Sequence, residues 1–334
     1  MLENVRFHLE ETGKGHTAAG DKVRADKESV KAFRKQLSLL GDVFVNDAFG
    51  ASHRAHSSVV GVDCPVKCAG LLVAKELKSF QKILNNPPRP MVAILGGAKV
   101  ADKIKLVSSL IDKVDHLVIG GGMAYTFLKV IHGIEIGRSI YDKAGAEDVL
   151  QVVAKAKSKG VSIHLPKDFI CADSFSADAK TRVCTLKTGV PPGWMALDCG
   201  PSTSIETAQV LWRAKAIVMN GPLGVFEMNP FSSGTRSALE AIAAVTQLGE
   251  CTSIIGGGDS AAACKMFHME HLFSHISTGG GASLELLEGK QLPGIDNLDD
   301  NPNSPNNPNN PDNPSSPVLI TEAEGSENIL QAKL

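Results

Sequence analysis

Short apolar runs alternate with stretches of helical periodicity from residue 91 to residue 289. Five of the six runs contain glycine at or near their ends, as in MVAILGG and HLVIGGG. Six runs predict strands: residues 91–97, 116–122, 162–169, 216–222, 252–259 and 275–281. Six amphipathic stretches predict helices: residues 98–114, 123–131, 147–159, 204–216, 260–267 and 282–289. This alternation predicts an α/β fold with a parallel sheet covered on both faces.

The first 90 residues contain a shorter block of the same kind. Residues 5–9 (VRFHL) and 42–47 (DVFVND) predict strands, and residues 26–40 predict a helix between them. Residues 66–84 follow helical spacing. The apolar positions of that stretch are Ala69, Val73, Leu77, Phe80 and Leu84. The next segment, NNPPRP at 85–90, stops the helix and predicts a domain boundary.

Composition narrows the class of protein. The chain has 334 residues, and 34 basic against 36 acidic residues give a net charge of −2, which argues against a nucleic-acid partner. No apolar run is long enough to predict a membrane span, and the first residues predict no secretory signal. Seven scattered cysteines without a CxxC pair predict reduced thiols in an intracellular, cytoplasmic protein.

The end of the chain differs from the rest. Residues 301–317 read NPNSPNNPNNPDNPSSP, a composition that predicts an extended linker, so residues 297–334 are expected to form a disordered tail. The last three residues, Ala332–Leu334, read Ala-Lys-Leu and resemble the peroxisomal address Ser-Lys-Leu. A peroxisomal or glycosomal location is therefore the alternative to the cytoplasm, and chance is the other explanation of the tripeptide.

Glycine-rich turns that precede helices predict phosphate binding, because each offers free backbone N–H groups and the positive end of a helix dipole. No GxxxxGK[ST] stretch is present, which excludes a Walker-type site. Lys99 and Lys103 follow one such turn and would share one face of a helix. A bound phosphate would compensate their charge. The alternative is a pair of solvated surface lysines.

Asp259 stands where a strand ends and a helix begins, in GGGDSA. A carboxylate there can hold Mg²⁺ against phosphate oxygens, although an ordinary helix N-cap is the alternative. Arg54 lies in a loop after a predicted strand and Arg6 lies at the end of another short strand. Either can bind a carboxylate or phosphate, although each alone is more simply a surface residue.

Eight motifs in a fixed order resemble phosphoglycerate kinases and cover residues 2 to about 296. They are LENVRFH, DVFVNDAFGASHRAHSSVVGV, AILGGAKVADKIKL, GGGMAYTFLK, GWMALDCGP, NGPLGVFE, IIGGGDSAAA and ISTGGGASLELLEGK followed by LPG. The resemblance implies reversible phosphoryl transfer between 1,3-bisphosphoglycerate with MgADP and 3-phosphoglycerate with MgATP. It also implies a monomer of two Rossmann-like domains with parallel sheets.

The resemblance also implies a domain organisation and a set of site residues. Residues 1–65 would be the remnant of a glycerate-binding domain, 66–90 an interdomain helix and linker, and 91–296 the nucleotide-binding domain. The nucleotide contacts would be Gly97, Ala98, Lys99, Lys103, Gly121, Gly122, Asn220, Gly221, Glu227, Gly257, Gly258, Asp259 and Ser260. Lys99, Lys103, Arg54, Gly280 and Gly281 would act on the transferring group, Arg6 and Arg54 on the glycerate, and Asp259 on the metal.

Several departures qualify this resemblance. Family members have a stretch before LENVRFH with further basic ligands, so we expect an incomplete N-terminal domain, from a fragment or an incomplete gene model. Met219, Ala196 and Ser260 replace the usual tryptophan, glycine and threonine. Two alternatives stay open: a nucleotide-binding remnant with impaired catalysis, and a dehydrogenase suggested by the loose pattern Gly256-x-Gly258-x-x-Ala261.

Overall fold

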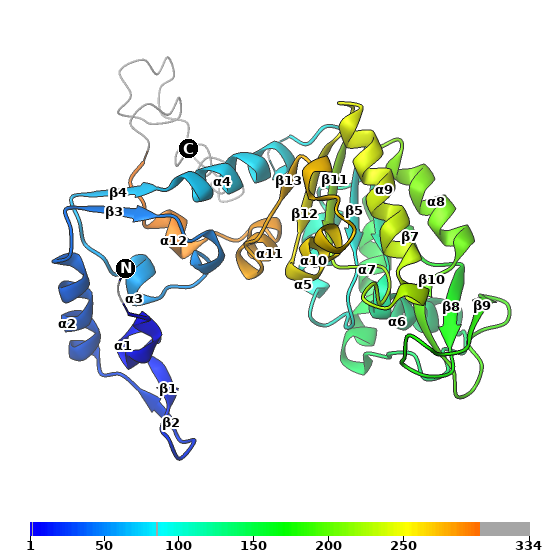
Figure 1. The fold of residues 1–334 in the computed structure, drawn as a ribbon, viewed down its shortest axis with the longest axis horizontal. Helices are drawn as coiled ribbons and strands as arrows, with labels where there is room; N and C mark the ends of the chain where they lie inside the picture. Colours follow the sequence, from blue (N-terminus) through cyan, green and yellow to red (C-terminus); the bar gives the residue numbers. More distant parts are fainter. Residues whose placement is uncertain (2, 85, 301–334) are drawn as a thin grey trace. The chain divides into compact units, whose positions relative to one another are not determined.

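A computed structural model gives the fold of residues 1, 3–84 and 86–300 (Figure 1). These residues form two compact units. One comprises residues 1–81 and 289–300, and the other comprises Lys82–Glu288. Of the tail expected over residues 297–334, the part from residue 301 onward, with its Ala-Lys-Leu end, lies outside the described residues. The expectation is wrong for residues 297–300, because Leu298 is buried and Asp299 is hydrogen-bonded to Lys67. In the described part of the chain, no helix combines the length and the apolar character needed to cross a membrane.

A six-stranded sheet forms the centre of the second unit. Its strands in spatial order are β13 (His275–Ile276), β12 (Thr252–Gly256), β11 (Ala216–Asn220), β5 (Met91–Leu95), β6 (His116–Ile119) and β7 (Ser162–His164). Every neighbouring pair is parallel. Each residue of β5 and β11 is buried, as expected of strands covered on both faces. The predicted α/β fold with a parallel sheet is thus confirmed.

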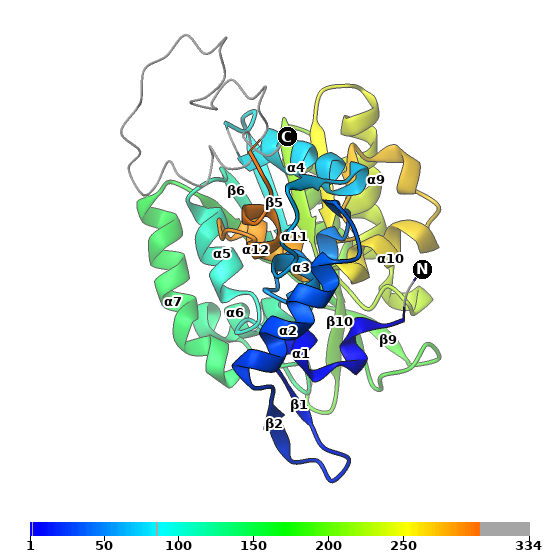
Figure 2. The same cartoon turned by 90° about the vertical axis from the view of Figure 1, so that its left-hand side faces the viewer.

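Helices cover both faces of this sheet, with α5, α6 and α7 on one side and α9 and α10 on the other (Figure 2). The helices of this unit are α5 (Ile104–Ile111), α6 (Gly121–His132), α7 (Lys143–Ser158), α8 (Pro201–Leu211), α9 (Ser233–Gln247), α10 (Gly258–Met266) and α11 (Gly281–Leu287), with short 3-10 turns η3 (Asn229–Phe231) and η4 (Glu270–Leu272). The core beneath α9 joins Leu239 and Ile242 to Ile217 and Met219, all fully buried. Each such side chain stabilises the fold by roughly 1.5–3 kcal/mol.

A second, antiparallel sheet of this unit does not follow from the alternating pattern. Its strands in spatial order are β10 (Met195–Cys199), β8 (Asp168–Ala172) and β9 (Thr181–Thr185). The strand predicted at 162–169 is wrong as a single element, because the chain divides it between β7 and β8. Pro166 lies between them, and a proline has no N–H to continue a sheet ladder.

The first unit is built from short elements. They are η1 (Val5–Phe7), α1 (Leu9–Thr12), β1 (Lys14–His16), β2 (Lys22–Arg24), α2 (Lys27–Ser38), β3 (Val43–Asn46), η2 (Phe49–Ala51), α3 (Ser57–Val60), β4 (Val66–Ala69), α4 (Leu71–Leu84), which continues into the second unit, and α12 (Pro293–Asp296). β1 and β2 form an antiparallel hairpin, and β3 pairs with β4 in parallel. The buried side of α4 includes Val73, Leu77 and Phe80.

Two predictions for this unit are wrong. Residues 5–9 do not form a strand, because the Asn4 side chain accepts a hydrogen bond from the Arg6 N–H at 3.0 Å and starts a 3-10 turn. The helix predicted over 66–84 begins at Leu71, since residues 66–69 pair with β3 instead. Helical spacing alone could not detect that long-range pairing.

Residues 289–300 pack against the first unit although they follow the second in sequence. The Asn46 amide donates to the Gly294 carbonyl at 2.9 Å, and Lys67 and Asp299 exchange two hydrogen bonds of 2.7 and 2.8 Å. The domain limits given above remain a prediction.

Candidate functional site

The order of the six-stranded sheet places β5 beside β11, so the chain turns in opposite directions on either side of this pair. Open α/β sheets bind ligands at such a switch point, beyond the carboxyl ends of the strands. The Gly96–Lys103 segment follows β5, and the Gly221–Glu227 segment follows β11. Two further glycine turns, at Gly120–Gly122 and Gly257–Gly258, follow β6 and β12 at the same edge.

These turns approach each other so closely that side chains are excluded. The Gly96 N–H donates to the Asn220 carbonyl at 3.0 Å, and a Cβ on Gly96 would overlap the Pro222 carbonyl oxygen. Gly121 has a φ of +64°, and a Cβ there would lie 2.7 Å from the Gly97 nitrogen. The glycines therefore let three turns meet at one point and leave backbone N–H groups accessible to an anion.

A cavity of about 340 Å³ opens at this edge of the second unit. Six predicted residues line it: Gly97, Ala98, Gly121, Gly122, Glu227 and Asp259. The sequence had not singled out most of the other lining residues, which are Tyr125, Arg138, Ser139, Ile140, Phe175, Met195, Ala196, Leu197, Pro222, Gly224 and Val225. Ala196 is the exception, since the GWMALDCGP motif drew attention to it. Residues 138–140 and Phe175 lie in loops without a glycine pattern.

Lys103 lies at the base of the turns. Its ammonium group donates to the Asn220 carbonyl at 2.9 Å and to the Asn220 Oδ1 at 2.6 Å. Burial lowers the pKa of Lys103 to about 8, while the carboxylates of Asp259 and Asp102 act in the opposite direction. The ammonium has therefore lost much of its hydration, and no carboxylate of the described residues forms an ion pair with it. Such a cation binds phosphate oxygens favourably, and the surface-lysine alternative does not hold for this residue.

Lys99 differs from Lys103, and the predicted helix is shorter than expected. Lys99 is exposed, and α5 begins at Ile104, so the expectation that both lysines share one face of a helix is wrong. The Ala101 N–H donates to an Asp142 carboxylate oxygen at 2.8 Å, and the Lys103 N–H donates to the Val100 carbonyl at 2.9 Å. These contacts hold residues 97–103 as a turn that comes before the helix.

Asn220 and Ser260 connect the turns after β11 and β12. Ser260 is fully buried and its hydroxyl accepts from the Gly221 N–H at 2.7 Å. Asn220 is 2 % exposed, and its Nδ2 is buried without a partner among the described atoms. An unpartnered buried amide costs free energy unless a ligand or water accepts its hydrogen bond.

Two carboxylates reach the cavity, those of Glu227 and Asp259. Asp259 lies in the first turn of α10, whose N-cap is Gly257 with no capping side chain, so the N-cap alternative for Asp259 does not hold. No cluster of three or more His, Cys, Asp or Glu side chains that could hold a metal occurs in the described residues. A single carboxylate suits Mg²⁺, which keeps several waters and takes its other ligands from phosphate.

The remaining predicted residues lie elsewhere. Gly280 is the N-cap of α11 and Gly281 its first residue, beyond the end of β13; neither lines the cavity. Arg6 and Arg54 belong to the first unit, and both are exposed. They gather around His56, whose pKa is lowered first by burial and further by Arg6, Arg54 and His53, against the opposing effect of Glu11. The sequence already places His53, Arg54 and His56 in one loop, and the structure adds Arg6 and Glu11 to this cluster in the first unit.

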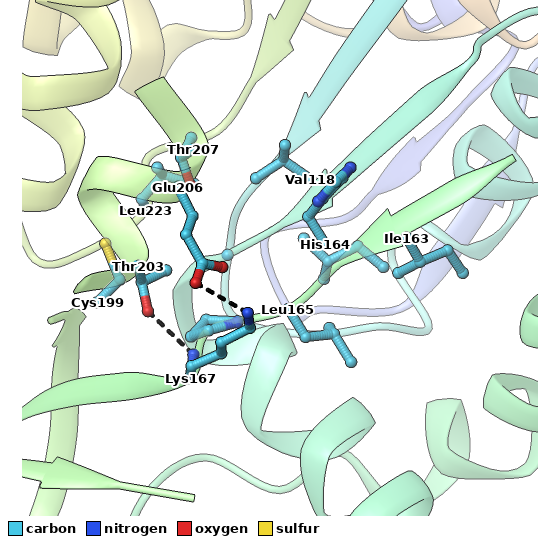
Figure 3. A pocket seen from close by; sticks show the side chains of 13 residues that line it. Val118, Ile163, His164, Leu165, Lys167, Cys199, Thr203, Glu206, Thr207 and Leu223 are labelled. Atoms are coloured by element: carbon cyan, nitrogen blue, oxygen red, sulfur yellow. Dashed lines mark hydrogen bonds and ion pairs between the residues drawn. The ribbon is translucent and has the colours of Figure 1, made fainter. Parts of the chain in front are cut away.

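A second cavity of about 260 Å³ lies between the end of the parallel sheet and α8 (Figure 3). None of the predicted site residues lines it. Lys167 and Glu206 form an ion pair of 2.8 Å at this cavity, and His164 lies 3.1 Å from His116, nitrogen to nitrogen. Burial and the neighbouring His116 lower the pKa of His164. The cavity combines paired charges with an apolar wall, so its lining does not favour one ligand charge.

Known proteins resemble the chain over most of its length. The family model for phosphoglycerate kinase matches residues 1–290. Phosphoglycerate kinase 2 of Sus scrofa and phosphoglycerate kinase 1 of Homo sapiens are each 55 % identical over 300 residues, which is 90 % of this chain and 72 % of theirs.

Two solved structures extend the comparison to the fold. The phosphoglycerate kinase from Coxiella burnetii has a TM-score of 0.76 at 42 % identity, over 82 % of this chain and 70 % of that one. The enzyme from Pyrococcus horikoshii has a TM-score of 0.69 at 29 % identity, over 88 % and 71 %. The family model and these relatives show that the chain belongs to the phosphoglycerate kinase family, in agreement with the glycine-lined cavity at the switch point of the sheet.

Proposed function

We propose that the chain transfers a phosphoryl group reversibly between 1,3-bisphosphoglycerate and MgADP, giving 3-phosphoglycerate and MgATP. The observation that carries this proposal is the desolvated Lys103 ammonium, which lies next to Gly97 of the cavity lining, in a member of this kinase family. Family membership removes the ground for the dehydrogenase alternative.

The nucleotide would occupy the cavity at the switch point. The glycines Gly97, Gly121, Gly122, Gly221, Gly257 and Gly258, with Ala98, would offer backbone contacts to the phosphates. Lys103 would bind a phosphate oxygen, and Asn220 and Ser260 would hold the turns and complete the contacts. Glu227 would accept hydrogen bonds from the ribose hydroxyls, a role that its exposed position in the cavity lining supports.

Asp259 would hold Mg²⁺, since it is a carboxylate that lines the cavity and lies within electrostatic range of Lys103. When bound, Mg²⁺ would neutralise phosphate charge and align the oxygens. In the transfer itself, the bond from phosphorus to the carboxyl oxygen of 1,3-bisphosphoglycerate breaks while a terminal oxygen of ADP bonds to phosphorus. Lys99 and the amides of Gly280 and Gly281 would stabilise the charge that passes between them.

Arg6 and Arg54 would bind the glycerate substrate. In the direction that consumes ATP the acceptor is a carboxylate, which is ionised near neutral pH, so no general base is required. Positioning and charge neutralisation are what this chemistry needs most. The basic cluster around His56 supplies positive charge for such a substrate.

The first prediction concerns activity. The purified chain should form ATP from MgADP and 1,3-bisphosphoglycerate, and Arg54→Ala should reduce kcat/KM by roughly 10- to 100-fold, because one charged hydrogen bond to substrate is lost. A coupled ATP assay would measure both proteins. Arg24→Ala, in the hairpin strand β2, is the matched control and should leave the rate unchanged.

MgADP binding without ATP formation would contradict the proposal and would favour the alternative, a nucleotide-binding remnant. Titration calorimetry with MgADP and with 3-phosphoglycerate distinguishes the two, because a remnant binds the first alone. Light scattering at the assay concentration tests the accompanying proposal that the chain is a monomer.

The second prediction concerns Lys103. Lys103→Ala should weaken MgADP binding by roughly 10- to 100-fold, the equivalent of about 1.5–3 kcal/mol for a charged hydrogen bond. Lys105→Ala is the control, since that exposed lysine is two residues away. Equal MgADP affinity in wild type and Lys103→Ala, measured by calorimetry, would remove Lys103 from the site.

The third prediction follows from the pKa of Lys103, which is about 8. The ammonium is charged below that pH and loses its charge above it. MgADP affinity should therefore fall as pH rises from 7.5 to 9.5, by up to about tenfold per pH unit above 8, until the higher pKa of the phosphate-bound lysine is reached. Lys103→Arg should keep its affinity across this range, because a guanidinium stays charged. A parallel decline in both proteins would assign the effect to another group.

The fourth prediction concerns location, which we propose to be cytoplasmic. A fluorescent fusion at the N-terminus, with residues 332–334 present or deleted, should stay in the cytosol in both forms. Fluorescence in peroxisomes or glycosomes that disappears on deletion would establish the tripeptide as an address instead.

A further inference from the structure

We propose that Asp198 and Thr235 are positioning residues that hold the Gly221–Glu227 segment in its nucleotide-binding conformation. The inference rests on the proposed function, because it assigns the nucleotide to the cavity that this segment lines. Neither residue lines that cavity, and both would act through other groups.

Asp198 is a fully buried carboxylate at the end of β10. Its Oδ1 accepts from the Cys199 N–H at 2.9 Å. Its Oδ2 accepts from the Gly234 N–H at 2.8 Å and from the Ser233 hydroxyl at 3.3 Å. All three contacts are donors, so they favour the ionised carboxylate.

The contacts to Ser233 and Gly234 tie Asp198 to the first turn of α9. That helix has 15 residues, and its N-terminus supplies free N–H groups and a positive dipole end. A buried carboxylate needs such compensation, because it has left water without an ionic partner among the described residues. Asp198 therefore fixes where α9 begins.

Thr235, in the same first turn of α9, connects the helix to the Gly221–Glu227 segment. Its hydroxyl oxygen accepts from the Leu223 N–H at 3.1 Å and from the Gly224 N–H at 3.3 Å. Thr235 is fully buried. Asp198 is thus connected to the Gly221–Glu227 segment through the first turn of α9 and the Thr235 hydroxyl.

A steric contact supports the same arrangement. A Cβ on Gly224 would overlap the Asp198 Oδ1 and would lie 2.7 Å from the Phe231 carbonyl oxygen. The next residue, Val225, donates its N–H to the Leu197 carbonyl at 2.9 Å. Gly224, Val225 and Glu227 line the cavity, so a shift of Asp198 or Thr235 would move the wall that faces the nucleotide.

The charge of Asp198 gives this role a measurable signature. Burial raises the pKa of Asp198 to about 7. The groups that face it are the Tyr125 hydroxyl, the Cys199 thiol and the Ser233 hydroxyl. The pKa of Tyr125 is raised well above 10 and that of Cys199 to about 12, so neither titrates near neutral pH. Below pH 7 the carboxyl becomes protonated and gives up acceptor capacity toward the α9 amides.

The test measures binding of MgADP to the full chain by calorimetry, with 3-phosphoglycerate as the second ligand. Asp198→Asn should raise the Kd for MgADP about tenfold, the size expected when a buried charged acceptor is lost. The Kd for 3-phosphoglycerate should stay unchanged. In wild type the MgADP affinity should fall between pH 7.5 and 6, and in Asp198→Asn this decline should disappear.

A matched control is available in Asp168. This buried carboxylate accepts from the Ser202 and Thr203 N–H groups at 2.9 and 2.8 Å, at the start of α8. Like Asp198 at α9, it therefore compensates the free N–H groups in the first turn of a helix. Residues of α8 line the second cavity and not the first. Asp168→Asn and Asp198→Asn should both lower Tm, but Asp168→Asn should leave the Kd for MgADP unchanged.

Two Thr235 variants keep the proposal testable if Asp198→Asn does not fold. Thr235→Val should weaken MgADP binding, and Thr235→Ser, which retains the hydroxyl, should restore it. An unchanged Kd in Thr235→Val, or an equal rise in Asp168→Asn, would overturn the inference. Wild type that fails to bind MgADP would instead overturn the proposed function, so the two failures are distinguishable.

Discussion

The parallel pairing of β5 with β11 is the constraint on which the second unit depends. It brings the ends of two strands that are more than one hundred residues apart in sequence into register, Leu95 beside Asn220. The turns beyond those ends then meet with no room for a Cβ at Gly96. That crowding explains why glycines such as Gly97 and Gly121 form part of the cavity wall. Lys103 is held next to them by its two hydrogen bonds to Asn220.

Burial in this unit removes water from two charged side chains and so shifts their pKa values. Lys103 and Asp198 have opposite charges, and burial shifts the pKa of each toward neutrality, to about 8 and about 7. Lys103 lies beside the cavity, where phosphate oxygens would restore favourable contacts. Asp198 lies behind the cavity wall, where helix amides already supply them. Lys103 is therefore the charge proposed to meet a ligand, and Asp198 the one proposed to hold the structure around it.

The residues proposed to bind the glycerate and those proposed to bind the nucleotide lie in different units. The arginine cluster around His56 lies in the first unit, and the glycine turns lie in the second. Phosphoryl transfer needs both an acid substrate and a nucleotide to be held, and little covalent chemistry from the protein.

The sequence by itself determined the α/β fold, the parallel sheet and the family, because hydrophobic periodicity and ordered motifs are local properties of the chain. It also indicated Gly97, Gly121 and Asp259 at the cavity. Tertiary structure alone decided the antiparallel sheet of β8–β10, the strand at Val66–Ala69 and the turn over residues 97–103. It also decided that Arg138 and Phe175 line the cavity, and that Asp198 supports it from behind. Each of these depends on a partner distant in sequence, which no local pattern encodes.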